Sequence, residues 1–193
     1  RRLPVVQGAA VAELCQQRFG CAPEEARLVE ERLPAAPWFD LSTANDRCDS
    51  LKHRLRLSEA DLQTVVMARP AVLGLSYEGT VAPSLKKLQI RLCMDDRQLQ
   101  RVVVKQPQVL GYSYEANLRP KLYFLEVELG LSPQALRESI VSKPARLGYS
   151  LERRYRPRLR ACRLAGADVE VVLRLAARTD ASFCQTIGLP LEE

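Results

Sequence analysis

The sequence predicts an all-α fold, a short α-solenoid of helix-pair repeats about 37 residues long. The first observation is an internal repeat, in which Gly74, Gly111 and Gly148 lie 37 residues apart inside three similar phrases. The second is the helical spacing of the apolar residues that precede each phrase. The third is the composition, 47% hydrophobic and 27% charged, which allows a sizeable buried core. Because one helix pair cannot bury its apolar face alone, we expect the copies to stack.

Each copy begins with a predicted helix that ends at a proline. Apolar residues four positions apart share one face of such a helix. They are Leu62 and Val66, Leu99 and Val103, and Leu136 and Ile140. The predicted N-caps are Ser58, Asp95 and Ser132, and the terminating prolines are Pro70, Pro107 and Pro144.

A short turn with the pattern Pro-x-x-Leu-Gly follows, and then a second predicted helix. The leucines of the turn, which we expect to be buried, are Leu73, Leu110 and Leu147. Serines are suited to the start of the second helix; they are Ser76, Ser113 and Ser150. A proline inside this helix removes a backbone hydrogen bond, so we expect a bend at Pro83, Pro120 and Pro157.

The whole chain, residues 1–193, is predicted to form a single helical-repeat domain. The regular repeats are 57–93, 94–130 and 131–167. Residues 1–56 form a degenerate first repeat, or cap, and residues 168–193 a partial last repeat, or cap. Atypical end copies are typical of stacked arrays, which must close their apolar ends.

These residues resemble the repeats of the mitochondrial transcription termination factor (mTERF) family. The resemblance is carried by the helix that ends in proline, the turn, and the motif NLRPKLYFL at Asn117–Leu125, and it is strongest over 57–163. It implies a left-handed superhelix of helix triplets whose basic concave side binds nucleic acid in mitochondria or chloroplasts. Family members act in transcription termination, ribosome assembly, splicing and translation. Typical members carry more repeats than this sequence does.

The charge is unevenly distributed. The net charge is +6, and residues 1–96 hold 13 basic and 13 acidic side chains, whereas residues 97–193 hold 16 and 10. This asymmetry predicts a polyanionic partner for the second half of the chain.

The stretch RRYRPRLRACR, Arg153 to Arg163, is the most basic part of the chain. On a helix with Tyr155, Leu159 and Cys162 turned inward, the arginines fall on two flanks. One flank holds Arg153, Arg156, Arg160 and Arg163, and the other holds Arg154 and Arg158. Like charges at this density repel one another, and phosphates would offset that cost. The alternative is a solvated face, or arginines paired with a protein partner.

Further cations recur near the repeat prolines, where stacking would align them along a phosphate backbone. They are Lys86, Lys87, Lys105, Arg119, Lys121 and Lys143. Taken singly, each could be a solvated side chain. Four tyrosines at repeat positions, Tyr77, Tyr112, Tyr114 and Tyr149, could stack on unpaired bases, although core packing is the more usual role.

No catalytic constellation is present, and we expect neither enzymatic activity nor a cofactor. The sequence has six cysteines without a CxxC pair and one histidine, His53, so it predicts no metal site and we expect reduced structural thiols. No apolar run is long enough to span a membrane.

The leading hypothesis is an organellar protein that binds structured RNA, such as ribosomal RNA, through its sugar-phosphate backbone. It would act as a subunit or assembly factor of an organellar ribosome, in mitochondria or alternatively in chloroplasts. One alternative is a factor that binds double-stranded DNA and regulates transcription or its termination. Another is a protein-interaction scaffold, in which the neutral first half binds a ribosomal or other protein partner.

Overall fold

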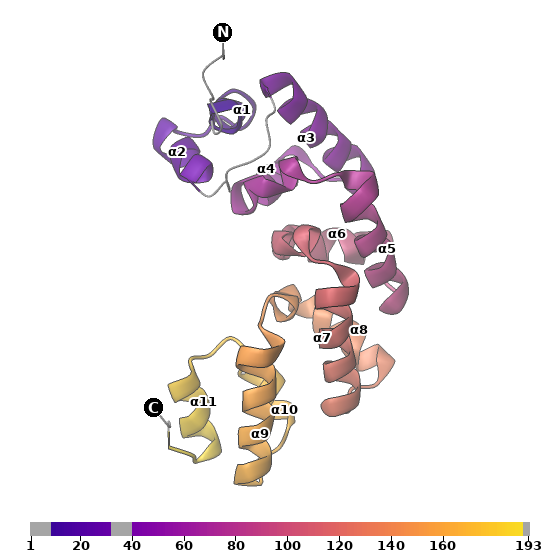
Figure 1. The fold of residues 1–193 in the computed structure, drawn as a ribbon, viewed down its shortest axis with the longest axis vertical. Helices are drawn as coiled ribbons and strands as arrows, with labels where there is room; N and C mark the ends of the chain where they lie inside the picture. The colour runs from indigo at the N-terminus through magenta and orange to yellow at the C-terminus, as the bar shows by residue number, and fades with distance from the viewer. Residues whose placement is uncertain (1–8, 32–39, 191–193) are drawn as a thin grey trace. The chain divides into compact units, whose positions relative to one another are not determined.

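The computed structural model describes residues 9–31 and 40–190, and every element within those ranges is a helix or a helical turn (Figure 1). The predicted all-α fold is therefore confirmed. The chain divides into two compact units, Arg1–Tyr114 and Glu115–Glu193. The boundary falls inside the second regular repeat, one residue after the start of its second helix.

The first unit contains α1 (Ala9–Phe19), α2 (Pro23–Glu31), α3 (Leu41–Leu55), α4 (Glu59–Ala68), η1 (Pro70–Gly74), η2 (Tyr77–Val81), α5 (Ala82–Arg91), α6 (Asp96–Lys105) and η3 (Pro107–Gly111). The turn η4 (Tyr114–Leu118) begins at its last residue. The second unit contains α7 (Arg119–Tyr123), η5 (Phe124–Glu128), α8 (Pro133–Ser142), η6 (Pro144–Leu147), η7 (Leu151–Tyr155), α9 (Arg156–Ala165), α10 (Glu170–Arg174) and α11 (Asp180–Ile187).

The first helix of each regular repeat begins at the predicted cap. The Ser58 side chain accepts a hydrogen bond from the backbone N–H of Asp61, whose carboxylate accepts one in return, and Asp95 forms the same reciprocal box with Gln98. Ser132 caps α8 by accepting from the N–H of Ala135. These bonds satisfy N–H groups that a helix start would otherwise leave without a partner.

The Pro-x-x-Leu-Gly phrase forms a turn of 3₁₀-helix in all three copies, as η1, η3 and η6. Its leucines point into the core, and Leu73, Leu110 and Leu147 are all buried. Each proline sits at the start of its turn, where a missing N–H is tolerated.

The second helix does not simply bend at its proline. It opens with a wider π-helical turn, η2, η4 or η7, and the proline then falls in the first turn of α5, α7 or α9. In the last copy the N–H of Arg156, the residue before Pro157, donates to the carbonyl of Leu151, five residues back. The widened turn lies just before the proline in each copy, so the helix changes its hydrogen-bond register at the residue that lacks an N–H.

The core is formed by the apolar faces that the sequence predicts. Tyr155, Leu159 and Cys162 of the last regular repeat are all buried, and the Tyr155 ring stacks on Phe124 with centroids 5.6 Å apart. Burial raises the pKa of the Tyr155 phenol, which donates a hydrogen bond to the Arg146 carbonyl.

Most cysteines are structural, as expected from the sequence. Cys15, Cys21, Cys48 and Cys162 are buried free thiols, and desolvation raises the pKa of Cys48 to about 12. Cys93 departs from this pattern because it is exposed.

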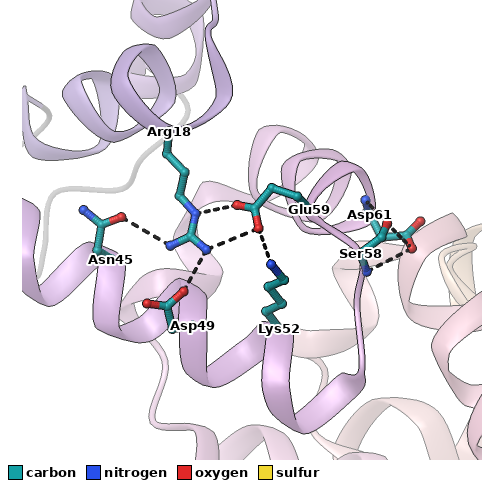
Figure 2. Close-up of polar contacts among 7 residues, drawn as sticks. All are labelled: Arg18, Asn45, Asp49, Lys52, Ser58, Glu59 and Asp61. Atoms are coloured by element: carbon teal, nitrogen blue, oxygen red, sulfur yellow. Dashed lines mark hydrogen bonds and ion pairs between the residues drawn. The ribbon is translucent and has the colours of Figure 1, made fainter.

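One polar cluster ties α1 to α3 and α4 in the first unit (Figure 2). Arg18 on α1 donates to Glu59 on α4 at 2.6 Å and to Asp49 on α3 at 2.7 Å. Lys52 on α3 also contacts Glu59, at 2.6 Å. The hydrogen bonds from Arg18 and Lys52 lower the pKa of Glu59 to about 2.

Candidate nucleic-acid interface

The arginine-rich stretch folds as η7 followed by α9, and the helix separates its arginines into the two predicted flanks. Arg153, Arg156, Arg160 and Arg163 are exposed. On the other flank Arg154 is half-buried and Arg158 is buried. The prediction that Tyr155, Leu159 and Cys162 turn inward is confirmed, and these three residues orient both flanks.

The exposed flank is only partly neutralised by the protein's own acids. Arg156 pairs with Glu152 at 3.1 Å and lies 3.7 Å from Glu128. Within residues 9–31 and 40–190, the side chains of Arg153, Arg160 and Arg163 have no hydrogen-bonding or ion-pair partner.

A hollow of about 830 Å³ lies along this flank. Arg156, Arg160 and Arg163 line it together with the carboxylates of Glu128 and Glu152. Three guanidinium groups around one open hollow form a site that attracts anions, because each presents several N–H donors in a planar fork.

Arg158 does not belong to this surface, contrary to the prediction from the sequence. Its side chain is 3% exposed. Its guanidinium donates to the carbonyls of Leu175 and Arg178, both at 2.7 Å, and to Asp180 at 2.6 Å. It also lies over the Phe183 ring, 4.7 Å from the centroid. All of these partners come from the last, irregular repeat, so Arg158 joins α9 to α10 and α11.

Arg154, one turn before Arg158, points the same way. It donates to the Ala176 carbonyl at 2.9 Å and lies over the Tyr149 ring at 5.2 Å. The second flank therefore holds the last repeat in place, and Arg154 is a weaker candidate for phosphate contact than the sequence indicates.

Lys121 is a second correction. It is 5% exposed, and its ammonium donates to the Leu147 carbonyl at 2.7 Å and to the Asn117 side chain at 2.9 Å. Burial lowers its pKa. The Lys121 side chain thus joins its own repeat to the turn of the next one. It is therefore not available to a phosphate.

Lys121 and Arg158 occupy the same repeat position, directly after the second proline, and Arg47 occupies it 74 residues before Lys121. Arg47 donates to the carbonyl of Leu73, as Lys121 does to that of Leu147. In both pairs the donor and the acceptor are 26 residues apart. We call this position the inter-repeat cation; in the first regular repeat it is Ser84. The 37-residue spacing is visible in the sequence, but the carbonyl that each cation reaches is not.

The other predicted cations are exposed. Lys86, Lys105 and Lys143 are exposed, and their side chains have no partner in the described part of the chain. Lys87 lies over the Tyr114 ring at 5.7 Å, and Arg119 pairs with Glu115 at 3.1 Å. Lys86, Lys105 and Lys143 therefore remain candidates alongside the exposed arginines.

Three of the four predicted tyrosines, Tyr77, Tyr114 and Tyr149, contact other side chains of the protein. Arg54 lies 5.0 Å above the Tyr77 ring, and Tyr149 packs edge-on against Tyr155 with centroids 6.1 Å apart. Tyr114 carries the Lys87 contact. The packing role is therefore the better supported one for these rings.

One surface regularity escaped the sequence analysis. Ile90, Val127 and Leu164 lie 37 residues apart and are 64%, 54% and 77% exposed. Leu164 borders the hollow of the arginine flank. The repeat alignment could have found this position, because apolar side chains recur there outside the buried line of the helix.

Within residues 9–31 and 40–190, no group of histidine, cysteine, aspartate and glutamate side chains could hold a metal ion. In the same ranges no helix has the length and apolar character needed to cross a membrane.

Comparison with known families identifies the chain. The mTERF family model matches residues 14–183, which is most of the sequence. The chain therefore belongs to the mTERF family, whose members are helical-repeat, nucleic-acid-binding proteins of mitochondria or chloroplasts and are generally not enzymes. A search of curated proteins gave no match.

Proposed function

We propose that this mTERF-family chain binds the sugar-phosphate backbone of structured RNA, such as ribosomal RNA, in mitochondria. The observation that carries the proposal is the exposed flank of η7 and α9, where Arg153, Arg160 and Arg163 have no acidic partner in the described chain. Three unpaired guanidinium groups on one helix flank repel each other, and phosphates relieve that repulsion.

The interface is reduced from twelve predicted residues to those that reach the surface. Its centre is Arg153, Arg160 and Arg163, and Arg156 contributes once its two carboxylate partners are outcompeted. Further contacts come from Lys86, Lys87, Lys105, Arg119 and Lys143, all of which are exposed.

RNA is proposed over DNA because the exposed cations can contact phosphates without reading base edges, which suits a target that is recognised by its shape. Structured RNA is recognised largely through its shape, its phosphates and its 2′-hydroxyl groups. Such binding suits a protein that attaches to one segment of ribosomal RNA as a ribosomal subunit or an assembly factor.

Fluorescence anisotropy tests this proposal. The probes are a labelled RNA hairpin and a DNA duplex of the same sequence, each titrated at several salt concentrations. The variant Arg153→Ala/Arg160→Ala/Arg163→Ala should bind RNA more weakly, and the slope of log K against log salt should fall in magnitude by about 2–3, because each lost phosphate contact is worth about 0.7–0.9.

A matched control removes the same charge elsewhere. Arg97, Arg101 and Arg174 are exposed and have no partner in the described chain, so Arg97→Ala/Arg101→Ala/Arg174→Ala should keep the wild-type slope. Equal losses in both triple variants would mean that net charge alone attracts the probe, which contradicts the proposed interface. Tighter binding of the DNA duplex would replace RNA by DNA as the target.

A further inference from the structure

The end of α3 forms a second basic hollow, in the first unit and on residues that the proposed interface does not use. The segment LKHRLR, residues 51–56, supplies four of its lining side chains, Lys52, His53, Arg54 and Arg56. Tyr77 and Glu78 of η2 also line the hollow, whose volume is about 820 Å³. Three full cations and a histidine thus face one lining carboxylate.

Arg54 contacts both Tyr77 and Glu78. Its guanidinium lies 5.0 Å above the Tyr77 ring and contacts the Glu78 carboxylate. The Arg54 and Glu78 side chains are 46% and 67% exposed. An ion pair so accessible to water is weak and is screened by salt. If a ligand displaces the Glu78 carboxylate, the Tyr77 ring still holds the Arg54 guanidinium in place.

Arg56 is still more accessible, at 79% exposure, and it lies 3.7 Å from the Asp96 carboxylate. Its backbone is left-handed, with φ 51°, because it caps the C-terminus of α3. Two repeats later the same position is Gly130, with φ 70°. A glycine adopts this conformation without strain, so α3 ends in an arginine where the backbone alone would favour glycine.

Lys52 is the least available of the cations. It contacts Glu59, which also accepts a hydrogen bond from Arg18, and that cluster holds α1, α3 and α4 together (Figure 2). The groups most accessible to a ligand are therefore the exposed His53 side chain and the guanidinium groups of Arg54 and Arg56, whose carboxylate partners are themselves exposed.

We propose that this hollow, the α3 basic hollow, binds a phosphate group of the nucleic-acid backbone. Each planar guanidinium fork can donate two parallel hydrogen bonds to a pair of phosphate oxygens, and a phosphate can replace weak, exposed carboxylate pairs. The proposal rests on the proposed function and adds to it, because it gives the first unit a nucleic-acid contact of its own. The balanced charge count of residues 1–96 conceals this site, since cations from one helix end gather at a single hollow.

The left-handed cap supplies a clean test. Arg56→Gly removes the guanidinium and relieves the backbone, so the melting temperature should stay equal or rise. The affinity for the RNA hairpin should fall, and the salt slope should decrease in magnitude by about 0.7–0.9, which corresponds to one phosphate contact. Loss of binding without loss of stability cannot come from unfolding.

The chain offers two matched controls. Cys93 lies 37 residues after Arg56 and shares its left-handed backbone, with φ 48°, so Cys93→Gly makes the same backbone change without removing a cation. Arg97→Ala removes one exposed positive charge from the same unit. Both variants should bind RNA with the wild-type salt slope. A wild-type slope for Arg56→Gly, or an equal decrease for Arg97→Ala, would overturn the proposal.

The two proposals fail separately. If Arg56→Gly leaves the slope unchanged while the triple variant of the arginine flank reduces it, only the α3 basic hollow is wrong. The opposite pattern leaves the hollow standing and removes the arginine flank. If polyglutamate displaces RNA from the wild type but not from Arg56→Gly, the hollow takes a carboxylate-rich protein, which also contradicts a phosphate site.

Discussion

The two flanks of η7 and α9 carry the same side chain in different surroundings. On one flank the guanidinium groups of Arg153, Arg160 and Arg163 extend into solvent. On the other, Arg158 is 3% exposed and donates to two backbone carbonyls and to Asp180. The difference lies in what packs against each flank, because the last repeat, as far as residue 190, supplies acceptors to Arg154 and Arg158 and none to Arg153, Arg160 and Arg163.

This comparison shows that a dense run of arginines is not a single functional unit. Burying a guanidinium is tolerated only where its donors are satisfied, and the carbonyls of Leu175 and Arg178 satisfy those of Arg158. The exposed arginines remain hydrated and available to a ligand. Helical position therefore decides which arginines support the fold and which can bind.

The largest expected effect is that of Arg158→Ala, which would break the buried flank. It removes the Arg158 donor from the Arg178 carbonyl, leaves the Leu175 carbonyl with only the backbone N–H of Arg178, and removes packing on Phe183. The free energy of unfolding should therefore fall by about 2–4 kcal/mol. Urea denaturation followed by circular dichroism measures the loss. Arg160→Ala is the control and should change the free energy by at most about 0.5 kcal/mol. Equal effects of the two variants would mean that the flanks do not differ.

Lys121→Met should have the next largest effect, since it keeps the aliphatic stem and removes the buried ammonium. The carbonyl of Leu147 loses its donor, and we expect a loss of about 1–3 kcal/mol. Lys86→Met, at an exposed position, should be nearly neutral in the same denaturation experiment. RNA affinity should stay unchanged in Lys121→Met, whose ammonium is buried, whereas Lys86→Met should lose one proposed phosphate contact.

Glu59→Gln removes the carboxylate that Arg18 and Lys52 share. The free energy of unfolding should fall by about 1 kcal/mol at neutral pH. The loss is small because the Glu59 side chain is 43% exposed and its ion pairs are therefore screened by water. The pKa of Glu59 is lowered from 4.5 to about 2 in the folded protein. Its stabilisation is thus complete above about pH 4.5 and is lost as the pH falls toward 2. The difference between wild type and Glu59→Gln should shrink between pH 7 and pH 2.5. A constant difference would show that the charge of Glu59 does not matter.

The smallest expected effect is an increase in the free energy of unfolding, for a substitution at Ser84. Ser84 occupies the inter-repeat position that Arg47 and Lys121 fill with cations. Ser84→Lys should place an ammonium near the Leu110 carbonyl and raise the free energy of unfolding by about 0.5 kcal/mol. Ser84→Met, of similar length without the charge, is the control. A loss of stability in Ser84→Lys would restrict the inter-repeat cation to the copies that already have one.

Much of the fold could be predicted from the sequence because its determinants are local. The caps at Ser58, Asp95 and Ser132, and the inward line of Tyr155, Leu159 and Cys162, follow from helix periodicity and capping chemistry. Even the division of the arginines into two flanks follows from the period of a helix.

Which flank is buried and which is exposed could not be predicted from the sequence. Arg158 finds its acceptors 17–22 residues away, in a repeat too irregular to align with the others. Lys121 reaches a carbonyl 26 residues away, and backbone acceptors leave no trace in a sequence. The α3 basic hollow was missed for the same reason, since part of its lining comes from η2.

The most direct measurement is a paired determination of melting temperature and RNA affinity for two variants of equal design. Arg153→Ala/Arg160→Ala should lose affinity at an unchanged melting temperature, whereas Arg154→Ala/Arg158→Ala should lose melting temperature. The second variant, measured while still folded at low temperature, should keep most of its affinity. Full RNA binding by Arg153→Ala/Arg160→Ala would contradict the account, because the exposed flank would then have no part in holding the nucleic acid.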